Sequence, residues 1–298
     1  MNARLLFTHT LSPLHAGTGQ GIGVIDLPIA REKATGIPYL PGSSLKGTLR
    51  DLCIDSNKEK VYGPDTNKAD EHAGSAQFTD QRLLLLPIRS LAGTFAWVTS
   101  PYLLRRFLRD AKDAGVSNIP PSLNVPSVNE QDCYVVQSYA LNTQQVLCKL
   151  VLQVDSAQKV VLEDLDLVPS ENPQANIWAQ LIALYVFTDI DWQRMVGERF
   201  CIVSDDVLSF LLDTATEITA RIKLQDDVKT VQKGGLWYEE ALPTETILYG
   251  LVVATPIPNS GMTHDNVFTV VRGSIQPVVQ LGGKATVGRG LCRLQLQA

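Results

Sequence analysis

The order of hydrophobic and polar positions predicts strands and helices in irregular alternation. Near the amino end, Leu5, Phe7 and Leu11 fall on alternate positions, which is typical of a half-buried strand. Further strands are expected at residues 83–88, 93–99, 134–139, 146–154, 217–224, 236–238 and 246–254. Helices are expected from Pro101 to Gly115 and over residues 174–188 and 205–213. Because strands and helices do not alternate strictly, the pattern favours an α+β fold over a doubly wound sheet.

Three polar or Gly-rich segments interrupt this pattern. Residues 17–23 carry glycine at every second position, and residues 282–290 form a second Gly-rich loop before a final strand. The polar residues 225–235 lie between two predicted strands, so a projecting hairpin is expected there. Residues 56–76 are polar and turn-rich, which predicts an exposed loop. No internal repeat or linker divides the chain, so a single domain over residues 1–298 is expected.

Composition and charge narrow the class of protein. Of the 298 residues, 45% are hydrophobic and 19% charged, and no apolar run reaches the roughly 18 residues of a membrane span. The first residues lack the pattern of a signal peptide, so a cytoplasmic protein without membrane contact is expected. Five scattered cysteines without a CxxC pair predict reduced, mostly buried thiols. The net charge of −5 argues against nucleic-acid binding unless basic residues gather locally.

The glycine runs fit neither common nucleotide-binding fingerprint. Gly17, Gly19, Gly21 and Gly23 follow a GxGxGxG spacing with no helix after it, which excludes a dinucleotide-binding turn. The segment 42–48 is not a P-loop, because Lys46 precedes its glycine. Both segments are therefore interpreted either as simple connecting loops or as backbone-lined anion sites.

Two loops combine free backbone amides with basic side chains. Ser43 or Ser44 is expected to cap a helix whose start can bind an anion, with Lys46 and Arg50 one turn apart. The last Gly-rich loop offers Gly283, Lys284, Gly288 and Arg289. Together these residues are candidates to hold an RNA backbone without reading its bases. The alternative is that the basic residues only form a solvated surface.

Several segments resemble the RAMP superfamily. Residues 14–19, 23–32 and 37–47 look like the opening of these proteins. The segment VIDLPIARE (residues 24–32) is similar to the backbone subunit of type III-B CRISPR (Cmr) effector complexes in particular. Residues 74–90, 95–99, LWYEEALP (236–243) and the final Gly-rich loop resemble that subunit as well, so the resemblance covers nearly the whole chain.

The resemblance implies a fold, an activity and partners. It implies a ferredoxin-like (RRM-like) palm with Gly-rich loops and a thumb hairpin over residues 217–243. Copies of the subunit would stack along a CRISPR guide RNA beside other Cmr subunits and cut complementary target RNA at regular intervals. The matching catalytic residue is Asp26, which would also bind a divalent ion (Mg or Mn) in a metal-dependent endoribonuclease. His15 and Glu239 match as candidate helpers.

The chemistry agrees with this assignment, although each residue also has a purely structural interpretation. RNA cleavage by its own 2′-hydroxyl needs in-line geometry, proton removal and charge stabilisation, which a carboxylate can assist. A single carboxylate is a weak metal site, so the ion would be shared with RNA phosphate. Alternatively, Asp26 only forms a turn, His15 only packs at a strand end, and Glu239 is a solvated hairpin residue.

The sequence leaves three rival functions open. The first is the equivalent backbone subunit of the type III-A complex, which the segments 26–32 and 236–243 disfavour. The second is a purely structural guide-RNA-binding subunit, with cleavage elsewhere, for which Asp26 would have no purpose. The third is a guide-processing RNase, which usually relies on a histidine-centred site and finds only His15 here.

Overall fold

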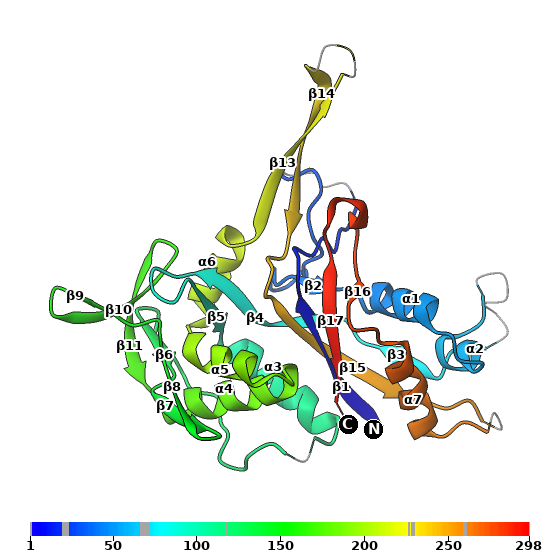
Figure 1. The fold of residues 1–298 in the computed structure, drawn as a ribbon, viewed down its shortest axis with the longest axis horizontal. Coiled ribbons are helices and arrows are strands. Elements are labelled where there is room, and N and C mark those ends of the chain that lie inside the picture. The colour runs from blue at the N-terminus through cyan, green and yellow to red at the C-terminus, as the bar shows by residue number, and fades with distance from the viewer. Residues whose placement is uncertain are drawn as a thin grey trace.

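A mixed sheet organises the chain in the computed structural model, which describes residues 2–19, 24–65, 72–116, 118–225, 227, 230–258 and 261–297 (Figure 1). Within those residues, thirteen strands join in one sheet, with the main order β16-β17-β1-β15-β4-β5-β12-β6-β11-β10-β9, while β2 pairs with β4 and β3 with β15. The strands are β1 (Ala3–Thr10), β2 (Tyr39–Leu40), β3 (Ala76–Phe78), β4 (Gln81–Arg89), β5 (Phe95–Thr99), β6 (Asp132–Val135), β9 (Leu152–Val154), β10 (Ala157–Leu162), β11 (Leu165–Glu171), β12 (Phe200–Ile202), β15 (Ile247–Ala254), β16 (Val279–Gln280) and β17 (Leu291–Leu296). Most neighbours are antiparallel, but β12 runs parallel to β5 and β11 to β6.

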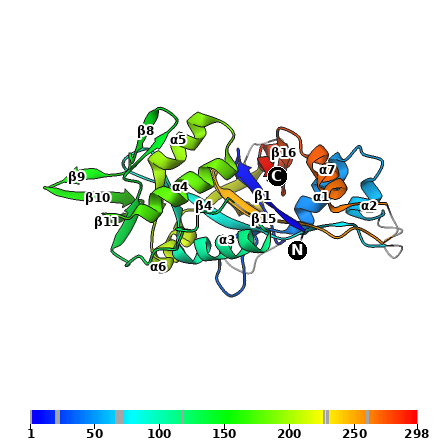
Figure 2. The same ribbon diagram turned by 90° about the horizontal axis from the view of Figure 1, so that it is seen from below.

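Helices cover both faces of this sheet. They are α1 (Gly42–Leu52), α2 (Lys58–Tyr62), α3 (Pro101–Asp113), α4 (Pro173–Val186), α5 (Ile190–Arg199), α6 (Asp205–Thr214), α7 (His264–Ser274) and the 3-10 turn η2 (Ala285–Val287). Leu5 and Phe7 of β1 belong to a core shared with α3 and α4, which lie against β4 and β1 (Figure 2). Leu6 belongs to a second core shared with α1 and α7. The prediction that the first strand is half-buried is therefore wrong, because helices cover both of its faces.

Two hairpins stand apart from the sheet. β7 (Ser138–Leu141) pairs with β8 (Gln144–Leu147), and β13 (Glu217–Leu224) pairs with β14 (Val231–Ala241). The β13–β14 hairpin projects at the top of Figure 1, and its two strands confirm the predicted projecting hairpin. The amino-terminal segment and the last Gly-rich loop both lie at its base (Figure 1).

Most predicted elements are confirmed, with three kinds of difference. The predicted strands 134–139 and 146–154 each divide into two, and α5, α7, β10–β12 and the very short strands β2, β3 and β16 were not predicted. The prediction of an exposed loop over residues 56–76 is wrong in its described part. That part contains the helix α2, whose residues Val61 and Tyr62 are buried. Tyr62 stacks on Phe78 with ring centroids 5.9 Å apart, and this packing holds the segment against the fold.

The predicted class holds at the level of a mixed α and β fold without strict alternation. All five cysteines are free and all but Cys148 are buried, as expected. Among the helices that the structure describes, none combines the length and apolar character needed to span a membrane.

Candidate functional site

Segments far apart in sequence meet at the base of the β13–β14 hairpin. Single bridges join Leu14 to Leu242, His15 to Gly283 and Leu27 to Glu239. The segments on either side of the first Gly-rich loop, the last Gly-rich loop and the base of β14 therefore form one assembly. The three predicted catalytic residues, Asp26, His15 and Glu239, all belong to it.

Asp26 is held at the edge of the hairpin. The backbone N–H of Tyr238 donates to its Oδ2 at 2.7 Å, and the N–H of Leu27 donates to the carbonyl of Tyr238 at 3.1 Å. The residue is nevertheless exposed. A backbone amide thus fixes one carboxylate oxygen while the group stays accessible to a bound molecule. Gly21 and Gly23 of the first Gly-rich loop lie outside the described residues.

His15 is buried behind this loop in a fixed orientation. Its Nδ1 lies 2.7 Å from the carbonyl oxygen of Glu240, so Nδ1 carries a proton and donates. In the neutral ring, Nε2 is then the acceptor. A Cβ atom at position 17 would lie only 2.5 Å from Nε2, which explains why Gly17 stands there.

Glu239 is buried and surrounded by donors. Trp237 Nε1 donates to its Oε1 at 2.8 Å, Lys284 Nζ lies 3.0 Å from the same oxygen, and Arg221 Nε lies 3.3 Å from Oε2. Burial alone would raise the pKa of Glu239, but the hydrogen bonds from Trp237 and Lys284, with that from Arg221, outweigh it and lower the pKa to about 2. The Glu239 carboxylate therefore stays ionised and bound to Lys284 and Arg221. This arrangement favours a role in holding these two cations over a role in proton transfer.

Glu240 is a site residue that the sequence analysis missed. Its buried carboxylate accepts from the N–H of Ile29 at 3.0 Å, from Arg31 Nη2 at 2.7 Å and from the Thr216 hydroxyl at 3.0 Å. The available signal was the pair of glutamates in LWYEEALP. Consecutive strand residues point to opposite faces, so the side chain of Glu240 faces away from the partners of Glu239.

The first predicted RNA-binding group lies on α1. The expected cap at Ser43 or Ser44 is wrong: α1 begins at Gly42 after Pro41, without a side-chain cap. The carboxylate of Asp80 instead accepts from the N–H of Gly42 at 2.8 Å, which satisfies one free amide of the helix start. Ser44 is half-buried in the first turn.

The helix α1 also borders an open cavity. Ser43 and Lys46 line this cavity of about 540 Å³ together with Tyr62 and Gly63. Arg50 points to the neighbouring loop, where its Nη2 lies 2.6 Å from Asp65 Oδ1. Of the predicted basic pair, Lys46 borders the cavity and Arg50 is already paired.

The second predicted group lies in the last Gly-rich loop. Gly283 donates its N–H to the carbonyl of His15 at 2.9 Å, and Lys284 and Gly288 adopt left-handed backbone angles. Arg289 is buried against the hairpin base, where its Nη2 donates to the Thr219 hydroxyl at 3.0 Å and its Nη1 lies 3.7 Å from Glu217. Lys284 and Arg289 thus attach this loop to β13 and β14.

The described residues do not form a protein-only metal site. No group of three or more His, Cys, Asp or Glu side chains in the part of the chain that the structure describes is arranged to hold an ion. Asp26 offers one accessible carboxylate, while Glu239 and Glu240 are engaged by cations and donors. The predicted divalent ion does not fit these residues alone.

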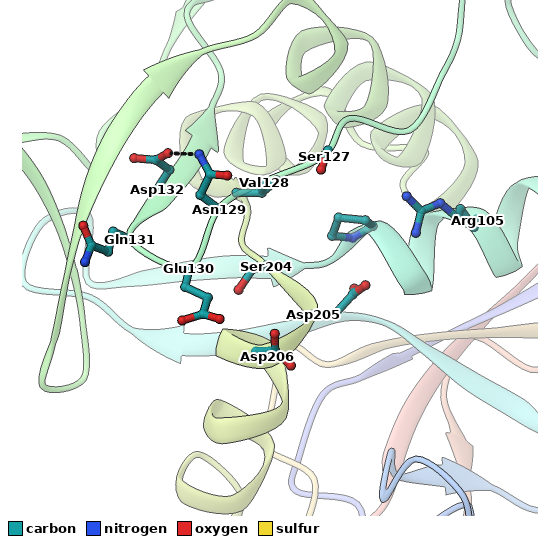
Figure 3. Close-up of a pocket in the computed structure, with 11 residues that line it drawn as sticks. Arg105, Ser127, Val128, Asn129, Glu130, Gln131, Asp132, Ser204, Asp205 and Asp206 are labelled. Atoms are coloured by element: carbon teal, nitrogen blue, oxygen red, sulfur yellow. Dashed lines mark hydrogen bonds between the residues drawn. The ribbon is translucent and has the colours of Figure 1, made fainter.

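A polar pocket of about 680 Å³ lies elsewhere, between the starts of α3 and α6 and residues 127–132 (Figure 3). It contains four carboxylates but none of the predicted site residues. Two of these carboxylates have structural roles: Asp205 accepts from the N–H of Tyr102 at 2.8 Å, and Asp132 accepts from Asn129 at 2.8 Å. Size alone therefore does not identify the site.

Comparisons with known proteins match nearly the whole chain. A model of the RAMP superfamily matches residues 9–293. The CRISPR system Cmr endoribonuclease Cmr4 of Pyrococcus furiosus is 34% identical over an alignment 307 positions long, covering all of this chain and 96% of that protein. The CRISPR system CMR subunit Cmr4 of Saccharolobus solfataricus is 24% identical, covering 97% of this chain and 94% of its own length.

Solved structures show the same likeness. The crystal structure of oligomeric Cmr4 from Pyrococcus furiosus superimposes with a TM-score of 0.72 at 27% identity, over all of this chain and 98% of that one. A subunit in the type III-B Cmr-beta complex bound to cognate target RNA superimposes with a TM-score of 0.70 at 21% identity, over 99% of this chain and 96% of that one. The second likeness concerns the fold alone.

Proposed function

The chain belongs to the RAMP superfamily, and from this membership we propose that it is an RNA-guided endoribonuclease subunit of a type III-B CRISPR effector complex. The observation that carries the proposal is Asp26, whose accessible carboxylate is fixed by the Tyr238 amide at the hairpin base. A full-length relative named as a Cmr endoribonuclease supports the activity, and a crystal structure of an oligomeric relative supports self-assembly.

In this proposal the chain is one RAMP domain working in the cytoplasm in antiviral defence. Strands around β1, β15 and β4 form the ferredoxin-like palm, and residues 217–243 form the thumb. The guide RNA backbone runs past the start of α1 and the last Gly-rich loop. Ser43, Ser44, Lys46 and Arg50 contact it from α1, and Gly283, Lys284, Gly288 and Arg289 contact it from the loop.

The proposed chemistry uses the residues at the hairpin base. Asp26 assists removal of the proton from the 2′-hydroxyl that attacks the adjacent phosphate, which yields 5′-hydroxyl and cyclic phosphate ends. His15 presents Nε2 as a second proton acceptor, with its orientation set by the Glu240 carbonyl. Glu239 keeps Lys284 and Arg221 in place, so that their charge lies close to the reacting phosphate.

A divalent ion would need ligands from the RNA. Asp26 supplies only one carboxylate, so Mg²⁺ or Mn²⁺ would be shared with phosphate oxygens of the bound strands. Loss of cutting in EDTA, followed by recovery when Mg²⁺ or Mn²⁺ is restored, would support this part of the proposal.

The test is the substitution Asp26→Asn in the reconstituted complex. We expect normal binding of guide and complementary RNA but cutting slowed at least about 100-fold, because general-base help is worth about 10²–10⁴-fold. The matched control is Asp265→Asn, whose carboxylate is 88% exposed on α7. Regularly spaced cutting that persists at the wild-type rate in Asp26→Asn would favour the alternative, a structural guide-binding subunit with cleavage elsewhere.

A further inference from the structure

Two consecutive glutamates of β14 are engaged by different loops. The carboxylate of Glu239 contacts Lys284 in the last Gly-rich loop, whereas that of Glu240 contacts Ile29 and Arg31 in the segment that follows Asp26. This division follows from the alternation of side chains along a strand. Glu239 thus attaches the hairpin to one loop and Glu240 attaches it to the other.

Glu240 contacts the Asp26 segment at every second residue. Its backbone N–H donates to the carbonyl of Leu27 at 3.0 Å, and its carboxylate accepts from Ile29 N–H and from Arg31. Its own carbonyl accepts from His15 Nδ1. One residue therefore contacts three positions after Asp26 and also orients His15.

The burial of Glu240 makes these contacts consequential. The residue is 3% exposed, and a buried carboxylate is tolerated only when donors satisfy it. Three donors do so here: a backbone amide, a guanidinium and the hydroxyl of Thr216, which directly precedes β13. Backbone bonds such as Ala30 N–H to Ala16 tie the residues after Asp26 to the segment that follows β1, while the Glu240 carboxylate adds a side-chain attachment to the hairpin beside the backbone bonds of Leu27.

From this arrangement we infer that Glu240 is a positioning residue, which sets where the Asp26 carboxylate stands relative to the hairpin. The inference rests on the proposed function, since it concerns the cleavage that Asp26 is proposed to assist. Glu240 does not touch substrate, because its carboxylate is buried and engaged by protein donors. Glu240 acts through Asp26, so its role can be tested separately from the catalytic role of Asp26 itself.

The experiment is a double-mutant cycle in the reconstituted complex, measured as single-turnover cutting. Glu240→Gln keeps the shape of the side chain but weakens its contacts with Arg31 and Ile29. We expect cutting about 10- to 100-fold slower at saturating target, since a small misplacement of a catalytic group costs this much, while target affinity stays within about twofold. In the Asp26→Asn background, Glu240→Gln should add little further loss, because both act on one group.

The outcomes separate the inference from the proposed function. If Asp26→Asn cuts normally, the proposed function fails. If Asp26→Asn is slow but Glu240→Gln cuts like wild type, or if the two losses multiply, the positioning role fails. The matched control is Glu171→Gln, an exposed carboxylate at the end of β11, away from the hairpin base. Its cutting rate should remain near that of wild type.

A second variant covers the case in which Glu240→Gln does not assemble. Thr216→Val removes one donor to the same carboxylate and leaves its charge paired with Arg31. We expect a smaller loss of cutting in the same direction, again absent in the Asp26→Asn background. The dependence of the rate on pH should keep its shape in both variants, because neither residue transfers a proton. A changed shape would overturn the positioning role.

Discussion

The Glu239 carboxylate is a buried charge whose surroundings more than compensate for its burial. Trp237, Lys284 and Arg221 donate to it and lower its pKa to about 2 despite desolvation. A group whose folded-state pKa lies below its unfolded value stabilises the fold above the unfolded pKa. The value for an unperturbed glutamate is 4.5, so this contribution should be complete above about pH 4.5 and lost as the pH falls toward about 2.

This pH dependence can be measured by urea unfolding of the isolated protein. We expect wild type to lose about 1–3 kcal/mol of unfolding free energy from this residue between pH 5 and pH 2.5, at about 1.4 kcal/mol per unit of pKa difference. Glu239→Gln cannot titrate, so the gap between the two proteins should narrow as the pH falls. A gap that stays constant across this range would contradict the pKa.

At the scale of single residues, the sequence predicted the site only in part. Asp26, His15 and Glu239 were identified through the family motif, and the structure brings their segments together. Glu240 and the burial of Arg289 were not identified, because both depend on which loop packs on which face of the hairpin. That packing joins Arg289 to a residue 70 positions away and Glu240 to one 211 positions away, and local patterns do not encode it.

At the scale of elements, the hairpin combines a fixed base with an exposed outer half. Ile222, Leu236 and Val231 are about half exposed and lie on the outer part of the hairpin. This part of the hairpin pairs only within itself, whereas Glu240 and Leu242 at the base form backbone bonds with Leu27 and Leu14. The outer half therefore adds little to the stability of the rest of the fold.

Shortening the hairpin should separate folding from function. Arg221 and Trp237 lie opposite each other, so residues 222–236 can be replaced by Asn-Gly, which favours a tight two-residue turn. We expect the melting temperature to change by only a few degrees, and the reconstituted complex to lose its regularly spaced cuts. Unchanged cut positions in the shortened protein would show that the outer hairpin does not set them.

The elements that went unpredicted did carry local signals. The Asp189 side chain accepts from the N–H groups of Asp191 and Trp192 at the start of α5, and Thr263 with Asn266 forms a capping box on α7. Both are sequence-level signatures of helix starts. The short strands β10–β12 offered less, because their pairing partners are set by the sheet and not by their own composition.

At the scale of the whole molecule, the net charge of −5 has to be reconciled with RNA binding. Several basic side chains at the site are neutralised by carboxylates in the structure, including Arg31, Arg50 and Lys284. An isolated subunit should therefore bind RNA weakly, and repeated copies along one strand should bind it much better, since each adds its own contacts.

The expectation that copies assemble along one RNA strand can be tested by measuring self-assembly of the isolated chain. A subunit that contacts its neighbours head to tail has no reason to stop at a dimer, so multimers should grow with protein concentration and with added guide RNA. Analytical ultracentrifugation of the purified protein, with and without a short guide RNA, measures this directly. A monomer at every concentration in both conditions would contradict a backbone role.

The alternation along β14 also limits how the hairpin can change in evolution. Inserting or deleting one residue just before Glu239 would exchange the faces of all side chains beyond it, so each glutamate would meet the wrong loop. Changes by two residues preserve the parity of the strand and keep both attachments. Near its base the hairpin can therefore vary only in even steps, whereas its outer part, residues 222–236, can vary in length without changing these attachments.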